Sequence, residues 1–351
     1  MNKRSLKVND RVIDDHSECY VIAEIGHNHQ GELEKATELF RAAKLAGVQA
    51  VKLQKRDNES LFTKAAYERP YENENSYGLT YGKHREFLEF GREEYKVLTQ
   101  LALDLGLDFF STAFDIPSAD FLMDFDPPAF KIASGDLKNF PLLAHVARFG
   151  KPMIISTGGG SLEDIKSTYD HIRPINDRIC FLQCTATYPT EACDLNLRVI
   201  ETLRSEFPEV VVGLSDHYNG ISMAPAAYVL GARVIEKHFT LNHTWKGTDH
   251  ALSLEPIGMH KMVRDLQRLR AALGSPDKAC LDIEKPAITK MGKSLFAGRE
   301  LPAGHTLTRA DIAIKSPGGG IPPSEFEVLV GKTLKIPVAA DHTFSPNDFA
   351  G

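Results

Sequence analysis

Ionisable side chains recur at the ends of short apolar runs along this chain. Glu24, Lys52, Lys131 and Glu236 each lie within or at the end of such a run. A buried charge without a partner is costly, so a ring of these four residues makes physical sense only around a polar ligand. An internal salt bridge is the alternative for any one of them, and it explains the whole set less well. The uncharged polar candidates near the same run ends are Gln54, Thr112, Ser134, Ser156, Tyr188 and Ser215.

These residue types match the needs of an anionic substrate. Lys52 and Lys131 supply positive charge, and the serine and threonine hydroxyls donate hydrogen bonds. Three glycines at 158–160 precede a helix start at Ser161, where backbone N–H groups can point at a phosphate. The glycine loop is weak evidence alone, but with the two lysines it predicts a phosphate pocket.

Two histidines follow neighbouring apolar runs. His217 and His238 are 21 residues apart in the sequence, yet their imidazoles can meet if these runs are adjacent strands. Two histidines completed by water and substrate oxygens suit an octahedral ion such as Mn²⁺ or Mg²⁺ better than structural zinc, which takes four protein ligands. Ordinary hydrogen bonding is the alternative for each histidine.

The fold must bring the ends of these apolar runs close together in space. Apolar runs rich in Val, Ile and Phe alternate with stretches of helical periodicity, a rhythm typical of βαβ units. Eight such alternations in about 250 residues favour a closed (β/α)8 TIM barrel over residues 1–275. An open doubly wound sheet is disfavoured because no GxGxxG motif opens the first helix. The expected strands are 20–25, 50–54, 108–111, 129–132, 153–156, 179–184, 210–215 and 233–238, and the expected helices include 33–46, 93–105, 162–172, 197–207, 221–230 and 259–273.

The remaining segments have other patterns. Residues 6–13 predict a small hairpin at the bottom of the barrel, and 57–90 form a long irregular insertion on the face where barrels keep their active sites. Residues 276–291 contain Pro276, Pro286 and mixed charge, and they read as a linker. Residues 292–351 predict a compact, turn-rich second domain with β-prone pieces at 294–297, 312–315 and 333–336.

Composition excludes several classes of protein. The formal charge of −6 comes without basic clusters, which argues against nucleic acid or an anionic membrane as the main partner. The five cysteines include no CxxC pair, so neither a disulfide framework nor a thiolate zinc site is expected. No apolar run has the length of a membrane span, and the first residues lack the apolar stretch of a secretory signal, so we expect a cytoplasmic protein.

The chain resembles the sialic acid synthase family, that is, N-acetylneuraminate synthase and related nonulosonic acid synthases. The resemblance rests on a series of strings in order along the predicted strands, and KSLFAGRELPAGHTLT with GKTLKI resembles the family's C-terminal antifreeze-like (β-clip, SAF) domain. The strings are AEIGHNHQG (23–31), VKLQ (51–54), KIASGD (131–136), ISTGG (155–159), LQCTATYP (182–189), GLSDH (213–217), EKHFTL (236–241) and KGTDHALSLEP (246–256).

This resemblance implies a condensation of phosphoenolpyruvate with a mannosamine-type sugar on a divalent metal, Mn²⁺ or Mg²⁺, held by His217 and His238. It implies that Glu24 contacts the sugar and takes part in proton transfer, that Tyr188 lines the sugar site, and that Asp249 binds hydroxyls at its far end. It also implies a domain-swapped homodimer in which the small domain covers the partner's barrel. The implied binders of phosphoenolpyruvate are Lys52, Thr112, Lys131, Ser134, Ser156 and Ser215.

Two departures from the bacterial sequence pattern leave the identity of the sugar substrate open. Ala186 replaces an asparagine of the bacterial pattern, and Ser316 stands where that pattern has an arginine. The insertion looks more like the animal-type branch, whose sugar is 6-phosphorylated, and charge for a second phosphate is available from Arg56, Arg69, Lys83 and Arg85. A synthase of legionaminic acid or of the deaminated nonulosonate, a metal-dependent hydrolase on the same barrel, and a non-catalytic carbohydrate- or ice-binding module are the competing interpretations.

Overall fold

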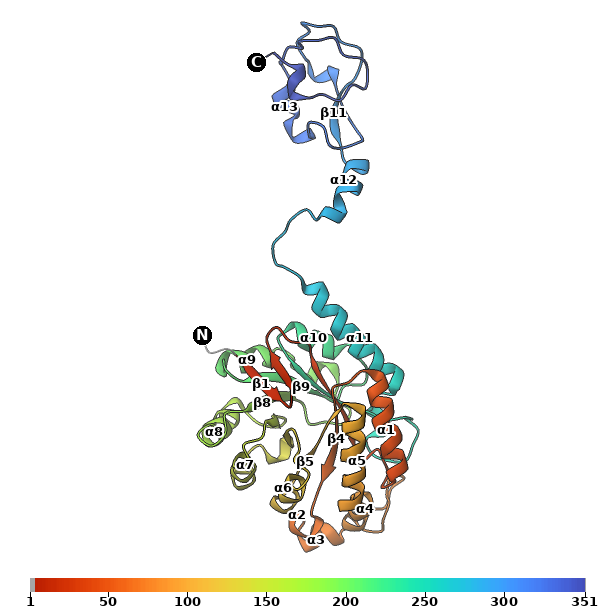
Figure 1. The fold of residues 1–351 in the computed structure, drawn as a ribbon, viewed down its shortest axis with the longest axis vertical. Helices are drawn as coiled ribbons and strands as arrows, with labels where there is room; N and C mark the ends of the chain where they lie inside the picture. Colours follow the sequence, from red (N-terminus) through yellow and green to blue (C-terminus); the bar gives the residue numbers. More distant parts are fainter. Residues whose placement is uncertain (1–3, 351) are drawn as a thin grey trace. The chain divides into compact units, whose positions relative to one another are not determined.

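Eight parallel strands close into a barrel in the computed structural model, which describes residues 4–350 (Figure 1). The strand order around the barrel is β10-β3-β4-β5-β6-β7-β8-β9, so neighbours in sequence are neighbours in space and the last strand returns to the first. This confirms the closed barrel against the open sheet. The strands are β3 (Tyr20–Gly26), β4 (Ala50–Lys55), β5 (Asp108–Ala113), β6 (Phe130–Ile132), β7 (Met153–Ser156), β8 (Ile179–Cys184), β9 (Val211–Asp216) and β10 (Val234–His238).

One principal helix follows each barrel strand and covers its outer side. Gly47, Gly106, Gly150 and Gly231 come between a helix and the next strand, and all four have positive φ, as expected of residues that end a helix cheaply. Among residues 4–350 no helix is long and apolar enough to span a membrane. The helices are α1 (Leu33–Ala46), α5 (Arg92–Leu105), α6 (Ile116–Met123), α7 (Phe140–Ala147), α8 (Leu162–Ile172), α9 (Val199–Glu206), α10 (Met223–Val229) and α11 (Pro256–Leu273).

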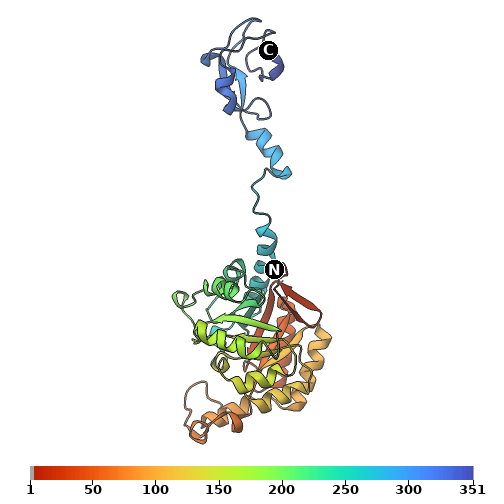
Figure 2. The ribbon, with the colours of Figure 1, turned by 90° about the vertical axis from the view of Figure 1, so that its left-hand side faces the viewer.

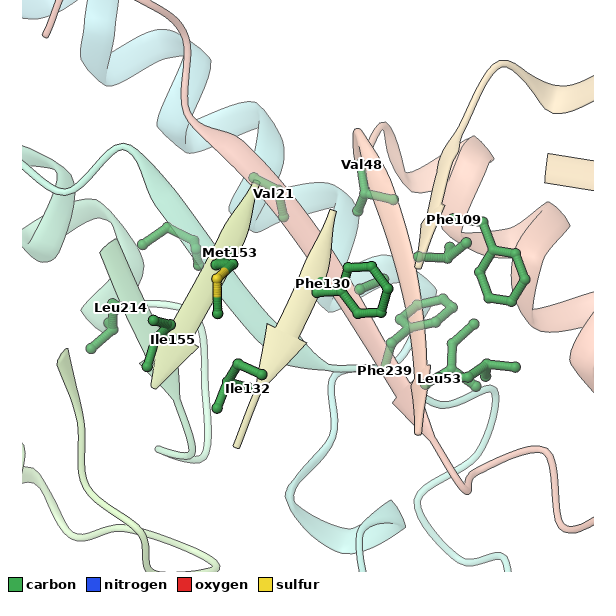
Figure 3. Packing of buried hydrophobic residues seen from close by; sticks show 14 of the residues in the cluster. Val21, Val48, Leu53, Phe109, Phe130, Ile132, Met153, Ile155, Leu214 and Phe239 are labelled. Carbon is green, nitrogen blue, oxygen red and sulfur yellow. The ribbon is translucent and has the colours of Figure 1, made fainter. Parts of the chain in front are cut away.

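Side chains alternate between the two faces of every barrel strand. Outward residues such as Val21, Leu53 and Phe109 pack against the surrounding helices (Figure 3). Inward residues change character along the strand, because an apolar layer near the start gives way to polar residues near the carboxyl end, as in Ile22 then Glu24. The apolar layer includes Ile22, Ala50, Phe110, Ile154, Cys180, Leu182, Val211 and Val234. The barrel therefore has a closed, apolar floor beneath a polar mouth.

A hairpin covers the floor of the barrel. Strands β1 (Ser5–Val8) and β2 (Arg11–Asp14) pair antiparallel, as predicted for residues 6–13. Apolar side chains of the hairpin join the buried cluster inside the barrel. In Figure 1 the hairpin lies at one end of the barrel and α2 and α3 lie at the other. The inserted residues are therefore on the same side as the carboxyl ends of the strands.

The insertion after β4 is more regular than its sequence pattern indicated. It forms three short helices, α2 (Asn58–Leu61), α3 (Lys64–Glu68) and α4 (Tyr81–Leu88). The side chains of Asp57, Thr63 and Thr80 accept hydrogen bonds from backbone N–H groups in the first turns. These N-caps are visible in the sequence, but helices of four to eight residues carry too little periodicity to be recognised.

The chain divides into two compact units between Gly274 and Ser275. The second unit begins with an extended stretch and α12 (Lys285–Met291), so the predicted linker is partly helical. Its core is a small apolar cluster beneath the antiparallel pair β11 (Ser294–Ala297) and β12 (Ile312–Lys315), with α13 (Phe326–Leu329) packed nearby. The third predicted β piece forms isolated bridges instead of a strand, because Thr333 pairs with Thr306 while Leu334 pairs with Phe349.

The second unit contains an internal repeat that our sequence analysis missed. Residues 303–312 (AGHTLTRADI) and 340–349 (ADHTFSPNDF) share a His, a Ser or Thr, and an Asp at the same spacing. His305 Nε2 lies 2.9 Å from Asp311 Oδ2, and His342 Nε2 lies 3.0 Å from Asp348 Oδ2. In both copies the carboxylate also accepts a backbone N–H three residues earlier. Each buried Asp therefore fixes one turn of a unit that has little regular secondary structure.

Replacing Asp311 by Asn is expected to destabilise the second unit. Burial acts to raise the pKa of Asp311, but contacts with His305, Thr308 and Arg299 outweigh it and lower that pKa. The stabilisation is therefore present above the ordinary aspartate pKa of about 4 and lost as the pH falls through the folded value. Loss of one charged cap should cost about 2 kcal/mol at neutral pH.

Hydrogen exchange of the full chain, followed by mass spectrometry over residues 292–350, measures this loss. The matched control is Glu327→Gln, which removes an exposed ion pair with Arg309 and should leave the exchange unchanged. Equal protection in Asp311→Asn and wild-type protein would contradict the assigned role of the carboxylate.

Candidate active site

A cavity of about 510 Å³ opens at the carboxyl ends of the barrel strands. Its volume lies in the range that holds a small metabolite. The twelve residues that the sequence assigned to catalysis, substrate binding or a metal all line it, although they come from seven strands and four of the segments that follow strands. They are Glu24, Lys52, Gln54, Thr112, Lys131, Ser134, Ser156, Tyr188, Ser215, His217, His238 and Asp249.

Lys52 lies at the centre of one side of the cavity. Its Nζ is 2.6 Å from Glu24 Oε2 and donates to Thr112 Oγ1 at 2.7 Å. Glu24 is positioned in turn by Gln54, whose Nε2 donates to Glu24 Oε1 at 2.7 Å. The strands β3, β4 and β5 thus hold one ammonium, one carboxylate and one hydroxyl in contact.

Lys131 is the second buried lysine that lines the cavity. Its Nζ donates to Ser156 Oγ at 2.7 Å and lies 3.7 Å from Glu236 Oε1. Ser215 Oγ donates to the same Glu236 Oε1 at 3.0 Å, and Glu236 Oε2 lies 3.8 Å from Lys52 Nζ. Glu236 therefore stands between the two lysines. The sequence placed it in the charged ring but not among the substrate-binding or catalytic candidates.

The pKa values of the two buried carboxyl groups are shifted in opposite directions. Burial raises the pKa of Glu24, and the negative charge of Glu236 adds to this effect while Lys52 opposes it. Burial acts in the same direction on Glu236, but Lys131 and Lys52 outweigh it and lower the pKa of Glu236. Glu24 is thus the carboxyl group suited to exchange a proton near neutral pH, whereas Glu236 stays ionised as a counter-ion.

The two histidines meet above these charges. The ring centroids of His217 and His238 are 5.5 Å apart, and the ring of Tyr188 lies 4.2 Å from that of His217. His217 Nδ1 is 2.9 Å from the carbonyl oxygen of Thr185, which leaves its Nε2 as an acceptor. His238 Nδ1 is buried without a hydrogen-bond partner and lies 3.9 Å from Asp249 Oδ2.

This histidine pair fits a divalent cation that takes its other ligands from water and substrate. Burial lowers the pKa of His217 to about 4 and also lowers that of His238, so both imidazoles are neutral, as metal ligation requires. Within residues 4–350 no group of three or more His, Cys, Asp or Glu residues is arranged to hold a metal. Two neutral imidazoles beside a cavity leave room for water and substrate oxygens, and this suits an open, octahedral ion better than a closed structural zinc.

The side of the cavity toward the insertion carries two guanidinium groups. Arg56 donates to Gln54 Oε1 at 2.6 Å and lies 3.8 Å from Glu89 Oε1. Arg85, on α4, contacts the hydroxyl of Tyr81 and lies 3.3 Å from His27 Nδ1, and no carboxylate lies within ion-pair distance of it among the described residues. A cavity-lining cation without an anionic partner is available to a substrate.

Two protein-family models match this chain, one in each of its two compact units. The model of the NeuB family matches residues 39–278, and the model of the SAF domain matches residues 292–350. The chain belongs to the NeuB family. This confirms the resemblance found in the sequence, including that of its C-terminal domain.

Several relatives of this NeuB-family chain have assigned names. It is 42% identical to the N-acetylneuraminate-9-phosphate synthase of Mus musculus over 93% of this chain and 91% of the relative. It is 37% identical to the N,N'-diacetyllegionaminic acid synthase of Legionella pneumophila over 93% of each chain. Among solved structures, the N-acetylneuraminic acid synthetase of Leptospira borgpetersenii, crystallised with citrate, matches with a TM-score of 0.72 and 29% identity over 82% of this chain and 95% of that one.

The two departures from the bacterial pattern lie in different units. Ala186 and Tyr188 both line the cavity, and the methyl group of Ala186 offers no hydrogen bond where the bacterial pattern has an asparagine. Ser316 belongs to the second unit, where its hydroxyl accepts from Lys293 Nζ at 2.5 Å. Lys83 and Arg69, which we considered as phosphate ligands, are exposed and absent from the lining, and Lys83 pairs with Glu86.

The glycine loop at 158–160 has another role than the one predicted. The N–H of Gly158 donates to Ser134 Oγ at 3.0 Å, so it holds a cavity side chain. Gly159 and Gly160 line a separate hollow near α9 and do not reach the lysines. The N–H of Gly160 donates to the carbonyl oxygen of Thr157 at 3.1 Å, so two of the three N–H groups that were expected to cradle a phosphate already have protein partners. The lining residues absent from our candidate list include Phe114, Cys184 and Thr248, which carry no sequence signal of their own.

Neutralising Glu236 should destabilise the barrel. In Glu236→Gln, Lys52 and Lys131 would share the single carboxylate of Glu24, and breaking buried ion pairs costs about 3 kcal/mol or more. Urea unfolding of the full chain measures the change. Inorganic phosphate, by replacing the lost negative charge, should stabilise the variant more than the wild-type protein. The control Glu201→Gln loses only an exposed ion pair, and an equal effect in both variants would contradict the account.

Proposed function

We propose that this chain is a nonulosonic acid synthase that condenses phosphoenolpyruvate with N-acetylmannosamine or its 6-phosphate and releases phosphate. One observation carries the proposal. Two buried lysines and two neutral imidazoles face one cavity, which therefore offers cationic and metal-binding groups within reach of the same small molecule. The names of the relatives supply the reaction, and the geometry supplies residues for each end of it.

Phosphoenolpyruvate would occupy the end of the cavity at Lys52 and Lys131. Its phosphate and carboxylate carry negative charge that these ammonium groups offset. The hydroxyls of Thr112 and Ser156 already accept hydrogen bonds from the two lysines and would contact the substrate without reorganising. Ser134 and Ser215 line the same cavity and would add two further hydroxyl groups.

The reaction forms one carbon–carbon bond and one carbon–oxygen bond to water, and it breaks the carbon–oxygen bond to phosphate. The methylene carbon of phosphoenolpyruvate attacks the aldehyde carbon of the open-chain sugar, water adds to the carbon that bears the phosphate, and phosphate leaves. Glu24 lies between Lys52 and the sugar side, and its raised pKa suits a group that gives a proton to the new alkoxide or takes one from the water. Lys131 stays near the departing phosphate and offsets its charge.

We assign a divalent metal, Mn²⁺ or Mg²⁺, to His217 and His238. Bound there, it supplies a Lewis acid for the sugar aldehyde. Tyr188 packs against the ring of His217, while Asp249 Oδ2 lies 3.9 Å from His238 Nδ1 and would accept hydrogen bonds from sugar hydroxyls.

The acceptor that best fits the guanidinium side is a phosphorylated sugar. Arg85 is the cavity cation without a carboxylate partner among the described residues, and a terminal phosphate would supply one. The relative with 42% identity is a 9-phosphate synthase, which agrees with this assignment. A legionaminic acid synthase remains the alternative because Ala186 leaves room for a bulkier substituent.

We further propose that the chain acts as a domain-swapped homodimer in the cytosol. The second unit exposes at least half of each side chain of Leu281, Ile283, Ile288 and Met291, an apolar set that association would cover. All five cysteines are free thiols, as expected of a reducing compartment. Light scattering after size exclusion would contradict the dimer if it gave the mass of one chain.

Lys131→Ala and His217→Ala should each abolish phosphate release while the fold remains intact. The first variant removes the charge beside the phosphate, and the second removes a metal ligand. A phosphate-release assay with phosphoenolpyruvate, Mn²⁺ and a panel of mannosamine derivatives measures the loss, and circular dichroism checks the fold. His145→Ala is the control, because His145 contacts Asp120 on the surface and is absent from the cavity. Near-normal turnover by either site variant would refute its assigned role.

Arg85→Ala should discriminate between acceptors. Loss of its charge is expected to raise the KM for N-acetylmannosamine 6-phosphate by about tenfold or more, because a charge-assisted hydrogen bond contributes about 1.5–3 kcal/mol. The KM for N-acetylmannosamine should change little. Lys83→Ala, an exposed change on the same helix, is the control. Equal changes for both sugars would show that Arg85 does not bind the terminal phosphate.

A further inference from the structure

Asp216 and Lys237 form an ion pair outside the catalytic cavity. Lys237 Nζ lies 2.9 Å from Asp216 Oδ2, and neither side chain has any exposed surface. Their neighbours Ser215 and Glu236 meet inside the barrel, so the alternation along β9 and β10 places this pair on the outer face. Stability alone is a weak reason for such a pair, because apolar residues of similar size often stabilise a fold as well.

The position of the pair is the first clue to its role. Backbone pairing of β9 with β10 ends at Asp216 and Lys237. His217 follows the last residue of β9, whereas His238 is the last residue of β10 and is still paired with Glu24 of β3. The β9–β10 ladder therefore ends one residue before both histidines, and it does not by itself fix the distance between them.

Each histidine is held from a different side. The carbonyl oxygen of His217 accepts from the N–H of Thr190 at 3.1 Å, and its ring contacts the carbonyl of Thr185, so it is attached to the loop after β8. The carbonyl oxygen of His238 accepts from the N–H of Leu254 at 2.8 Å, in the loop after β10. The distance between the two imidazole rings therefore depends on the contacts that connect the His217 segment with the His238 segment.

The ion pair makes that connection. Asp216 Oδ1 accepts from the N–H of Tyr218 at 2.9 Å, and Lys237 Nζ donates to the carbonyl oxygen of Tyr218. Asp216 and Tyr218, which flank His217, are thereby both bound to Lys237, which precedes His238. Inside the barrel, the hydrogen bond from Ser215 to Glu236 also crosses between the strands, but it lies before His217 and does not reach past it.

We propose that Asp216 and Lys237 are positioning residues that set the spacing of His217 and His238 for one shared divalent cation. The proposal rests on the metal assignment made under the proposed function. It predicts that the pair matters for metal affinity more than for folding, in the way that outer-shell partners of metal ligands typically change affinity by about 10- to 100-fold.

Mn²⁺ binding to the full chain without substrate tests this inference directly. The double variant Asp216→Asn/Lys237→Met removes both charges, nearly keeps their volume and leaves no unpaired buried ion. Electron paramagnetic resonance of free Mn²⁺ should give a Kd about tenfold or more above that of the wild-type protein. Thermal unfolding, followed in parallel, should change little. If the double variant fails to fold, Asp216→Asn alone should give a smaller increase in Kd.

Two controls separate the possible outcomes. Tyr20→Phe removes a buried hydrogen bond to Asp108 at the opposite end of the barrel, and its Kd for Mn²⁺ should stay within about twofold of the wild-type value. An unchanged Kd in the charge-free variant, or an equal increase in Tyr20→Phe, overturns the positioning role. His217→Ala should lose Mn²⁺ binding; if it binds as the wild-type protein does, the metal assignment itself is wrong and this inference falls with it.

Discussion

Charged side chains held out of water constrain the whole barrel. Glu24, Lys52, Lys131 and Glu236 lie within a few ångströms of one another, with almost no exposed surface. Each charge is tolerated because another lies opposite it, and the four charges sum to zero when Glu24 is ionised. An incoming anion must therefore compete with Glu24 and Glu236 for the lysines, which links substrate binding to the protonation of Glu24.

The layering of the barrel interior makes this arrangement possible. Apolar residues fill the floor, and the hairpin of β1 and β2 covers it. Above that floor each strand contributes one or two polar side chains, and successive strands are joined by register pairs such as Glu24 with Lys52 and Thr112 with Lys131. The charges are thus fixed by backbone pairing, which leaves little freedom for the side chains to separate.

The two ends of the cavity differ in whether strands or loops carry their side chains. The end proposed for phosphoenolpyruvate is built from strand residues in mutual contact. The end proposed for the sugar is built from loops, including the insertion that carries Arg85 and the segments that carry Tyr188 and Asp249. Loop residues change more readily than strand residues without loss of the fold, which agrees with the different sugar products in the names of relatives at 42% and 37% identity.

The amino-acid sequence by itself determined the barrel, the helix-ending glycines and the cavity residues at or just beyond the strand ends, because strand ends in a closed parallel barrel must converge on one mouth. Asp249, in the segment after β10, was predicted only from the family resemblance. Only the tertiary structure decided which of these residues touch. Glu236 emerged as the counter-ion between two lysines, the 158–160 loop turned out to support Ser134, and Lys237 with Asp216 was found behind the histidines. Such outcomes depend on side-chain direction and register between strands, and a linear pattern of residue types specifies neither.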